Sequence, residues 1–294
     1  MTGSTGLIGS ALVASLERDG HRVRRVSRRA DAGPGTVRWD PERGELDGAA
    51  LAGVDAVVHL AGEGIGDHRW SDEHKRRVLD SRVKGTTLVA ETMAALDPRP
   101  SVLVSASAIG YYGDRGDERL TEASPPGEGF LADVVRQWEG ATGAAEAAGI
   151  RVAHIRTGLV LARSGGALAP MLPLFRFGLG GRLGSGRQWW SWISLTDEVA
   201  AIRFLLDHDV AGPVNLTGPE PVTNAELTKV LGRVLHRPAV VPVPRFGPAL
   251  VLGREAAEEM VFASQRVLPT VLRREGFSFA HPTLEPALRA ELGR

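Results

Sequence analysis

The stretch Gly3-Ser4-Thr5-Gly6-Leu7-Ile8-Gly9 decides the fold of this chain. Glycines spaced as GxxGxxG let the backbone turn tightly and approach a pyrophosphate, which then lies on exposed N–H groups at the start of a helix. A helix is predicted over residues 8–16, and a strand over 21–26 follows at the separation that a βαβ unit requires. The loop therefore predicts a dinucleotide-binding turn whose contact residues are Gly3, Thr5, Gly6, Leu7, Ile8 and Gly9.

Short β-branched runs alternate with longer amphipathic stretches through the first half of the chain. The runs Ala56-Val57-Val58 and Val102-Leu103-Val104 are continuously apolar, as strands covered on both faces are. The alternation predicts an α/β fold with a doubly wound parallel sheet and helices on both of its faces. The expected strands are 21–26, 55–60, 101–105, 151–155 and 213–216, and the expected helices are 8–16, 73–94 and 130–148.

A Pro- and Gly-rich stretch over 164–186 interrupts this alternation. The helix that starts at Thr196 and the strand after it are expected to return to the sheet. We therefore predict a nucleotide-binding domain over 1–165, with 196–217 returning to it. A smaller C-terminal substrate lobe is predicted from 166–195 and 218–294.

The residues ahead of the glycine loop are too few for a strand. Only Met1 and Thr2 precede Gly3, although such a loop follows a buried strand and strands average about five to six residues. We expect that the first strand of the sheet is missing from this sequence. Met1 would then stand at an internal position, either because the natural start lies upstream or because the chain was shortened.

Composition excludes several classes of protein. The 294 residues carry 35 basic and 35 acidic side chains, and this zero net charge lacks the pattern of a nucleic-acid or anionic-membrane binder. The chain has no cysteine, which excludes disulfides, zinc–thiolate sites and a cysteine nucleophile. We find neither a targeting segment nor an apolar run near the roughly 20 residues of a membrane span. These features predict a cytoplasmic protein that acts on a small-molecule substrate.

Histidine spacing gives no sign of a metal site. The eight histidines show no HExxH or similar ligand pattern, so no metal is expected. His59 lies within an apolar strand, and we interpret it as a core histidine.

The residues after the second predicted strand, Val26-Ser27-Arg28, indicate which dinucleotide binds. An NAD-preferring site usually places an acid here for the ribose 2′-hydroxyl, but the first acid in this chain is Asp31. The Arg28 guanidinium can instead pair with a 2′-phosphate, and the Ser27 hydroxyl can donate a hydrogen bond to it. The alternative is a solvated basic turn. The position of Arg28 directly after this strand favours NADP binding.

Several further stretches resemble the extended short-chain dehydrogenase/reductase superfamily. More narrowly, the chain resembles an atypical NAD(P)-dependent epimerase family whose members carry a small C-terminal domain of unknown function. The similar stretches run in order over nearly the whole chain: Asp55-Ala56-Val57-Val58-His59-Leu60-Ala61-Gly62-Glu63, Arg69-Trp70, Ser81-Arg82, Ser105-Ala106-Ser107-Ala108-Ile109-Gly110-Tyr111-Tyr112-Gly113, Trp138-Glu139, Arg156-Thr157-Gly158-Leu159-Val160-Leu161, Gly184-Ser185-Gly186-Arg187-Gln188 and Trp192-Ile193.

This resemblance implies a Rossmann-type sheet, NADP in a cleft at the strand ends, and a substrate lobe over that cleft, in a monomer or homodimer. It also implies roles by position. Ser27 and Arg28 would hold the 2′-phosphate, and Leu60 and Ala61 would line the adenosine side. Gly62 would also contact the cofactor, Arg77 and Arg82 would reach it from the following helix, and Val160 would lie near the nicotinamide.

Most of the superfamily uses a Tyr-x-x-x-Lys pair with a nearby serine, and this chain lacks the pair. The lysine lowers the pKa of the tyrosine, so that the phenol passes a proton while hydride moves to or from the nicotinamide. At the corresponding place this chain reads Phe130-Leu131-Ala132-Asp133-Val134. No lysine lies between Lys84 and Lys229, so a shifted alignment restores nothing.

Three side chains remain as catalytic candidates. Ser107 can bind a substrate carbonyl or hydroxyl, or it only caps a turn at a strand end. Tyr112, without a cationic neighbour, is expected to stay protonated and to act as a hydrogen-bond donor. Glu63 directly follows the Leu-Ala-Gly turn and is expected to face the strand-end crevice, where it binds the cofactor or acts as an acid.

Two functions follow from these residues. The first is an NADP(H)-dependent oxidoreductase or epimerase with an altered proton relay. The second is a non-catalytic NADP(H)-binding sensor or assembly protein. The lost pair favours the second, whereas Ser107 and the loop over 187–192 favour the first, which we prefer.

Overall fold

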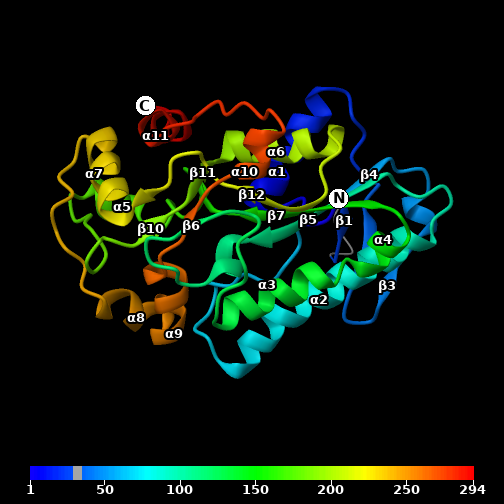
Figure 1. Ribbon diagram of the computed structural model, residues 1–294, viewed down its shortest axis with the longest axis horizontal. Coiled ribbons are helices and arrows are strands. Elements are labelled where there is room, and N and C mark those ends of the chain that lie inside the picture. Colours follow the sequence, from blue (N-terminus) through cyan, green and yellow to red (C-terminus); the bar gives the residue numbers. More distant parts are fainter. Residues whose placement is uncertain (29–34) are drawn as a thin grey trace.

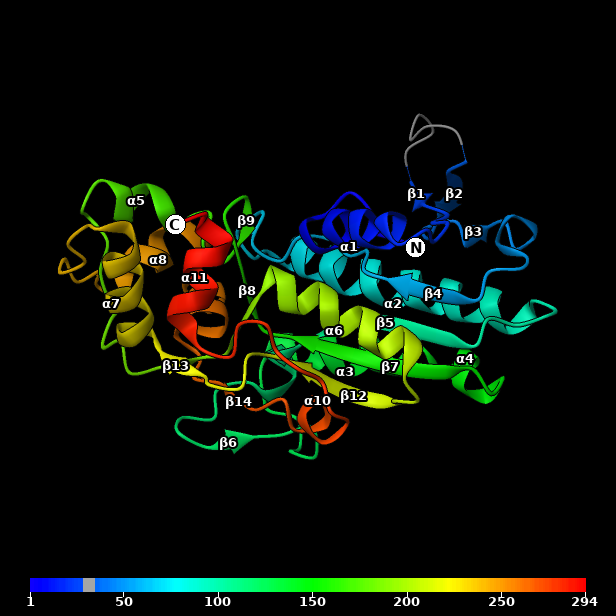
Figure 2. The ribbon, with the colours of Figure 1, turned by 90° about the horizontal axis from the view of Figure 1, so that it is seen from above.

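A four-stranded parallel sheet forms the centre of the computed structural model, which describes residues 1–28 and 35–294; Asp31 lies outside the described residues. Its strands run in the order β12-β7-β5-β4 (Figure 2). Val102 pairs with Ala56 on one side and with Arg151 on the other, which buries the predicted apolar runs between neighbours. The strands are β4 (Ala56–His59), β5 (Val102–Ala108), β7 (Arg151–Thr157) and β12 (Gly212–Leu216).

Helices cover both faces of this sheet (Figure 1), and the predicted doubly wound α/β fold is confirmed. On one face α1 packs against α6 over a core that includes Val104 and Ile155. On the other face α2 packs against α3 and α4 over a core that includes Leu103 and Val152. The helices are α1 (Leu7–Arg18), α2 (Asp72–Ala95), α3 (Phe130–Gly140), α4 (Gly143–Ala147) and α6 (Leu195–Asp207).

Thr2 lies beside β4, between this strand and β1 (Val26–Ser27). Thr2 bridges Val26 on one side and His59 on the other, both in parallel register. A cavity of about 610 Å³ adjoins Met1 and Thr2 and is lined largely by apolar side chains such as those of Val57 and Leu206. The missing first strand stays a prediction. Beyond Thr2 lie the edge strands β1, β2 (Val37–Asp40) and β3 (Glu45–Leu46).

Two predicted elements are wrong in extent. The strand expected over 21–26 is only the two-residue β1, in which the Val26 amide donates a hydrogen bond to the Met1 carbonyl oxygen at 2.8 Å. The helix expected over 130–148 breaks between α3 and α4. At the break, the Thr142 hydroxyl donates to the Glu139 carbonyl (2.8 Å) and contacts His154 (2.9 Å), a competition with the helical pattern that is typical of threonine.

The C-terminal part of the chain builds a second core beside the sheet. Trp192, Leu231 and Leu288 are fully buried in it. Thr223 accepts a hydrogen bond from the Glu226 amide (3.2 Å) and caps α7. The elements here are β8 (Leu159–Ala162), β9 (Gly165–Gly166), α5 (Leu172–Arg176), β10 (Trp189–Trp190), β11 (Trp192–Ser194), β13 (Val222–Thr223), α7 (Asn224–Leu235), α8 (Phe246–Leu252), α9 (Arg254–Ala257), the π-helix η3 (Glu258–Phe262) and α11 (Leu284–Leu292).

Part of the C-terminal segment returns to the sheet domain. β14 (Arg266–Val267) pairs with β6 (Arg119–Leu120). Leu272, on α10 (Thr270–Arg274), is fully buried in the core beneath the sheet. The short 3₁₀ helices are η1 (Ala49–Leu51) and η2 (Ile109–Tyr112), and η2 directly follows β5.

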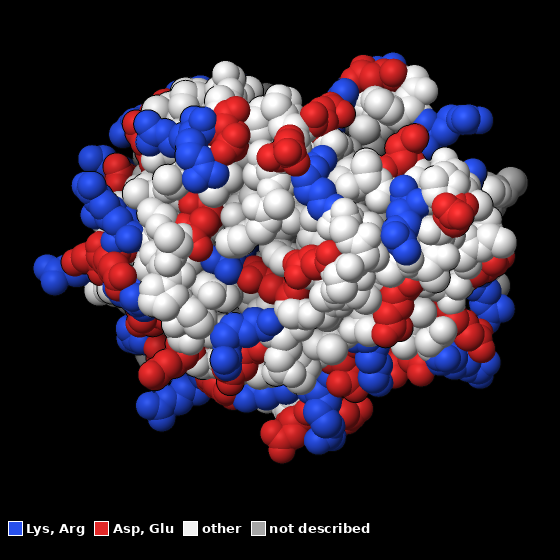
Figure 3. Space-filling model, turned by 45° about the vertical axis from the view of Figure 1, so that its right-hand side comes forward, with Lys and Arg blue, Asp and Glu red and all other residues white. Residues whose placement is uncertain are grey.

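Charged side chains of both signs are interspersed on the face seen in Figure 3, in keeping with the zero net charge. No helix in the described ranges is long and apolar enough to cross a membrane.

Candidate nucleotide site at the carboxyl edge of the sheet

The glycine loop is pressed against the end of β4. Gly3 has a φ of +64°, and a Cβ atom there would lie 2.7 Å from the carbonyl group of Leu60. A Cβ atom on Gly9 would lie 2.1 Å from the carbonyl oxygen of Gly3. Neither position has room for a side chain, so only glycine allows this turn.

The start of α1 is open to an anion. Gly6 is the N-cap residue, and the helix has no side-chain cap and no acid in its first turn. Thr5 and Gly6 are exposed. The first amides of α1 and the positive end of its dipole can therefore receive a phosphate group, as the glycine pattern predicts.

Thr2 links the glycine loop to the loop that follows β4, a role that the sequence did not reveal. Its hydroxyl oxygen accepts hydrogen bonds from the amides of Leu60 (3.1 Å) and Ala61 (3.2 Å). It also lies 2.8 Å from Nδ1 of His59. Because the oxygen already accepts from two amides, its proton points to Nδ1, and the histidine carries its own proton on Nε2.

His59 is a core histidine, as expected, but only one of its nitrogens is satisfied. Its Nε2 is buried without a hydrogen-bond partner in the described part of the chain, beside the edge-to-face ring of Trp39. Burial, and secondarily the positive N-terminus, lowers the pKa of His59 to about 3. The ring is therefore neutral at pH 7.

Arg82 holds the loop that leaves β4. Its Nη1 donates to the carbonyl oxygens of Glu63 and Val78, each at 3.0 Å, and its guanidinium lies 4.8 Å from the centre of the Trp138 ring. Burial lowers the pKa of Arg82 to about 10, although the negative charge of Glu63 opposes this shift. The Nε of Arg82 is buried and makes no hydrogen bond within residues 1–28 and 35–294. A cation with a spare donor fits a cofactor that carries phosphates, as the predicted role of Arg82 requires.

The remaining predicted cofactor residues separate into two groups. Ser27 ends β1 and Arg28 follows it, exposed, one position beyond the strand that Thr2 pairs with. Val160 is brought to the start of α1 by the β8–β9 hairpin: a Cβ atom on Gly166 would lie 2.3 Å from the Val160 carbonyl oxygen and 3.4 Å from the Leu7 side chain.

Arg77 lies apart from the other predicted cofactor residues. Its guanidinium pairs with Glu73, one turn away on α2, at 2.6 Å, and its side chain is 46% exposed. The geometry gives Arg77 a place on the outer face of α2.

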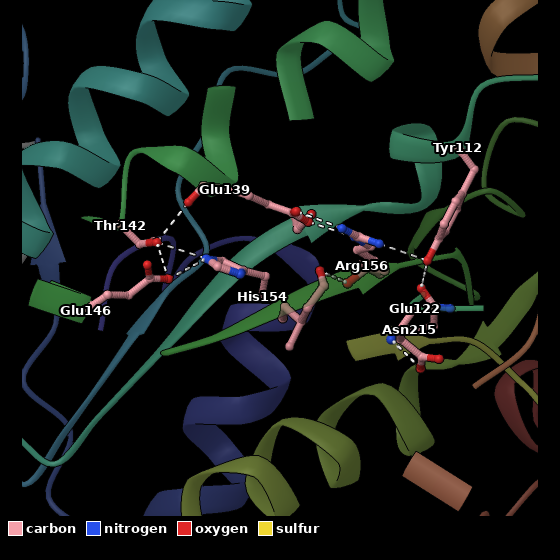
Figure 4. A network of polar contacts seen from close by, with 11 residues as sticks. Tyr112, Glu122, Glu139, Thr142, Glu146, His154, Arg156 and Asn215 are labelled. Atoms are coloured by element: carbon pink, nitrogen blue, oxygen red, sulfur yellow. Dashed lines mark hydrogen bonds and ion pairs between the residues drawn. The ribbon is translucent and has the colours of Figure 1, made fainter. Parts of the chain in front are cut away.

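Ser107, a predicted catalytic residue, lies inside β5 and donates a hydrogen bond to Oε1 of Glu139 at 2.6 Å. The same carboxylate accepts two hydrogen bonds from Arg156, both at 2.8 Å, so the pair is bidentate (Figure 4). Burial opposes charge on both groups, but their mutual hydrogen bonds lower the pKa of Glu139 and raise that of Arg156. Both side chains are nearly buried, and the ion pair joins α3 to β7.

Tyr112 extends this network. Its hydroxyl accepts a hydrogen bond from Nη1 of Arg156 (3.1 Å) and donates one to Oδ1 of Asn215 (2.7 Å). Asn215 is held by Glu122, whose carboxylate accepts a hydrogen bond from the backbone N–H of Asn215 at 3.1 Å. The side chain of Tyr112 is fully buried.

The expectation that Tyr112 has no cationic neighbour is wrong, because Arg156 comes from a strand 44 positions away. The phenol nevertheless stays protonated: burial raises the pKa of Tyr112 to about 12 and outweighs the opposing effect of Arg156. Glu139 and Arg156 themselves were missed as functional candidates. The available signal was a charged residue near the end of a predicted buried strand, as Arg156 is after Val152-Ala153-His154-Ile155.

Glu63 differs from the other two candidates in its surroundings. Its backbone is fixed by hydrogen bonds with Ser81 and Arg82, and its side chain is half-buried beside the loop that follows β4. Glu63 follows the predicted cofactor residues Ala61 and Gly62 in the chain, and its role toward the cofactor stays a prediction. The described residues contain no group of three or more acidic, histidine or cysteine side chains that could hold a metal ion.

Comparison with known proteins gives the family. Residues 1–218 match the model of the NAD dependent epimerase/dehydratase family, and residues 243–291 match a domain of unknown function, DUF1731. The chain belongs to the NAD dependent epimerase/dehydratase family. This family membership confirms the resemblance found in the sequence.

Relatives of this epimerase-family chain span nearly its whole length. It is 46% identical to the epimerase family protein ML0860 of Mycobacterium leprae, over 98% of this chain and 93% of that protein. It is 36% identical to the human epimerase family protein SDR39U1, over 98% and 97%. The crystal structure of human SDR39U1 (isoform 2) with NADPH superposes with a TM-score of 0.91 at 34% identity and covers 99% of this chain and 98% of that one.

Proposed function

We propose that this chain binds NADP(H) at the carboxyl edge of its sheet and acts on a small-molecule substrate as an oxidoreductase or epimerase. The observation that carries the proposal is the uncapped start of α1 behind a glycine loop that has no room for side chains at Gly3 and Gly9. The human relative that was crystallised with NADPH supports it.

The proposed contacts combine this geometry with the roles that the family resemblance implies. The first amides of α1 bind the pyrophosphate, and Ser27 and Arg28 bind the 2′-phosphate after β1. The loop with Leu60, Ala61 and Gly62 flanks the adenosine side, Val160 lies toward the nicotinamide, and Arg82 offers its spare Nε. When bound, the cofactor donates or accepts hydride.

We further propose Glu63 as the side chain that holds or moves a proton at its carboxylate. Ser107 and Tyr112 are less suited, because the hydroxyl of each is already hydrogen-bonded inside the network of Glu139, Arg156 and Asn215. Glu63 lies beside the proposed cofactor contacts and is half-buried instead of enclosed.

The second candidate function is non-catalytic NADP(H) binding, in a sensor or assembly protein. The enclosure of Ser107 and Tyr112 favours it, because the hydroxyls that could replace the lost Tyr-x-x-x-Lys pair face the interior. A panel of carbonyl substrates, tested for NADPH oxidation with wild type and Glu63→Gln, separates the two functions. Turnover that falls in the variant supports catalysis through Glu63, and no turnover by wild type across the panel supports the binding protein.

Thermal unfolding with each nucleotide tests the cofactor directly. A nucleotide at 100 times its Kd is expected to stabilise the native chain by about 2.7 kcal/mol. At equal concentrations of the two nucleotides we expect a larger shift with NADPH than with NADH, because only NADPH carries the 2′-phosphate that Arg28 binds. Arg28→Ala should remove this preference.

Arg38→Ala is the matched control, because Arg38 is exposed on β2 directly opposite Ser27. It should keep the preference for NADPH. Equal shifts with the two nucleotides in the wild type, or no shift with either, would contradict the proposal.

A further inference from the structure

A short stretch of the C-terminal segment crosses to the starts of α2 and α3. The carbonyl oxygen of Val251 accepts a hydrogen bond from Nε of Arg69 (3.2 Å), and Glu255 forms an ion pair with Lys75 (2.5 Å). Further along, Glu259 reaches α3. We call this set of contacts the clasp: Val251, Glu255 and Glu259 on one side, and Arg69, Lys75 and the amides of Phe130 and Leu131 on the other.

Glu259 supplies the cap that α3 lacks. The N-cap residue of α3 is Gly129, which has no side chain, and its φ is +106°. The two carboxylate oxygens of Glu259 accept hydrogen bonds from the amides of Phe130 (3.0 Å) and Leu131 (2.8 Å). A Cβ atom on residue 129 would lie 3.0 Å from this carboxyl group, so the glycine makes room for it. An acid at a helix start also interacts favourably with the helix dipole.

Lys75 sits at the point where α2, α3 and the C-terminal segment meet. Its ammonium lies 5.0 Å from the centre of the Phe130 ring and 5.7 Å from that of Trp70. These two rings contact each other edge to face at 5.0 Å. The ion pair with Glu255 therefore joins the C-terminal segment to a lysine whose ammonium group is already positioned by two aromatic rings.

The clasp lies at the edge of the sheet that carries the glycine loop. Both α2 and α3 begin at this edge, and Figure 1 shows α8 and α9 beside their starts. The loop over 62–70, which leads from the cofactor residues to α2, is covered by the same segment: a Cβ atom on Gly66 would lie 3.3 Å from the Met260 methyl group.

Polar contacts link the clasp to α2 and α3, and the buried apolar side chains within residues 251–259 are the small ones of Ala256 and Ala257. Helix α8 has no buried residue, and the side chains of Phe246 and Leu250 are 66% and 65% exposed. The five-residue π-helix that carries Glu259 is a rare geometry that recurs at functional sites. Among residues 251–259 no large apolar side chain is buried, so the clasp can release with a small loss of apolar burial.

We propose that residues 251–259 form a polar clasp that closes the C-terminal lobe over the nucleotide cleft and must open for the nucleotide to leave. Glu259 is a positioning residue for the start of α3, and the pair of Lys75 and Glu255 is the latch. The nucleotide part of this inference rests on the proposed function. The clasp itself rests only on the contacts between described residues.

A charge swap tests the latch. In Lys75→Glu the new carboxylate faces Glu255, and in Glu255→Lys two ammonium groups face each other, so each single change should open the clasp. The double variant K75E/E255K restores the pair with reversed sign and should close it again. Lys84→Glu is the matched control, because Lys84 lies on the same helix but pairs with Glu42 and Asp80, away from the clasp.

Two measurements show whether the clasp opens in these variants. Hydrogen exchange in the nucleotide-free protein reports on the amides of Phe130 and Leu131, and stopped-flow fluorescence reports on the rate of NADPH release. Each single variant should raise both rates by at least about fivefold. The double variant should return toward wild type, and Lys84→Glu should match wild type.

Glu259→Ala should speed amide exchange at 130 and 131 in the same assay. Unchanged exchange in the single variants would overturn the clasp. Faster exchange with an unchanged rate of NADPH release would overturn its closure over the cleft. Failure of the wild type to bind NADPH would count against the proposed function, while the exchange measurement still decides the clasp.

Discussion

At the scale of single residues, the buried polar groups of this chain separate into those that are paired and those that are not. Glu139 and Arg156 satisfy each other in a bidentate pair, and Ser107 and Tyr112 complete their hydrogen bonds. Glu198, in contrast, has one oxygen bonded to the Thr157 hydroxyl (2.8 Å) and the other buried without a partner in the described chain. Substitution of a paired group should therefore lower the stability of the fold, whereas substitution of the unpaired Glu198 should raise it near neutral pH.

Ser107→Ala should destabilise the fold by about 1.5–3 kcal/mol, because it removes a hydrogen bond to the buried Glu139 carboxylate. Ser105→Ala is its control, since Ser105 lies two residues earlier on β5, fully buried, with no hydrogen bond from its hydroxyl within the described residues. That change should cost little or nothing. Urea unfolding of both variants measures the difference, and equal losses of stability would contradict the structural role of Ser107.

Arg156→Leu should cost more, about 3–5 kcal/mol, because it leaves the Glu139 charge buried without its partner. The same urea titration compares it with Ser107→Ala. A loss no greater than that of the serine variant would show that Glu139 is solvated or protonated when the arginine is removed.

Glu198 predicts a pH dependence of stability. Burial raises the pKa of Glu198 to about 8, although the hydrogen bond from Thr157 opposes the shift. Between the ordinary glutamate pKa near 4.5 and this value, the unfolded chain loses the proton and the native chain keeps it. The contribution of Glu198 to stability is therefore fully present below about pH 4.5 and is lost as the pH rises toward 8.

Glu198→Gln should remove this loss. Relative to wild type, the variant should gain stability between pH 5 and 8 with a slope of at most about 1.4 kcal/mol per pH unit. The free energy of unfolding measured at several pH values gives the slope. Glu226→Gln, an exposed acid near the start of α7, should run parallel to wild type, and the same behaviour from Glu198→Gln would refute the buried, protonated state.

At the scale of elements, the gap beside β4 is the largest departure from a continuous sheet. Thr2 pairs with both neighbours, and the cavity beside it is lined in part by Ala56 and Val57 of β4. Burial also lowers the pKa of the α-amino group of Met1 to about 6, since a charge there lacks solvation.

An extension of five alternating Val and Ile residues ahead of Met1 should pair with β4 and fill this cavity. Each buried side chain contributes about 1.5–3 kcal/mol, offset in part by the entropy of ordering the residue. Because about 1 kcal/mol shifts the Tm of a chain of this size by about 2–4 °C, a rise of several degrees is expected. A five-residue Gly-Ser extension is the control, and equal Tm values for the two extensions would contradict the prediction.

At the scale of the whole molecule, the C-terminal segment is part of the sheet domain as well as of its own core. Val267 and Leu272 are fully buried, the first beside Leu120 and Tyr112 and the second in the core beneath the sheet. β14 pairs with β6, so the backbone also links the two parts. Unfolding of the lobe alone would expose part of the core of the sheet.

Leu272→Ala should therefore destabilise the entire molecule by about 2–5 kcal/mol. Denaturation followed by tryptophan fluorescence and by far-ultraviolet circular dichroism should give coincident transitions, both shifted by the same amount. Leu250→Ala on the exposed face of α8 should leave both transitions in place. Two separated transitions in the wild type would show that the lobe and the sheet unfold independently.

Local sequence patterns predict the parts of this fold that depend on neighbours in the chain. The glycine loop, the apolar strands and the cap at Thr223 need only spacing and residue type, because turn geometry, strand burial and helix capping act over a few residues. Where local patterns failed, a tertiary contact had replaced the local one. The break between α3 and α4 occurs where the Thr142 hydroxyl bonds to a strand residue, His154.

The sequence by itself determined the glycine loop at residues 3–9, the doubly wound sheet and the absence of the Tyr-x-x-x-Lys pair. Only the tertiary structure decided which polar groups lie in the site and which in the core. Tyr112 meets Asn215 across 103 positions and Phe130 meets Glu259 across 129, and nothing in either neighbourhood indicates the partner. The physical reason is that a hydrogen bond or ion pair depends on distance in space, which the packing of helices on the sheet sets after the local elements have formed.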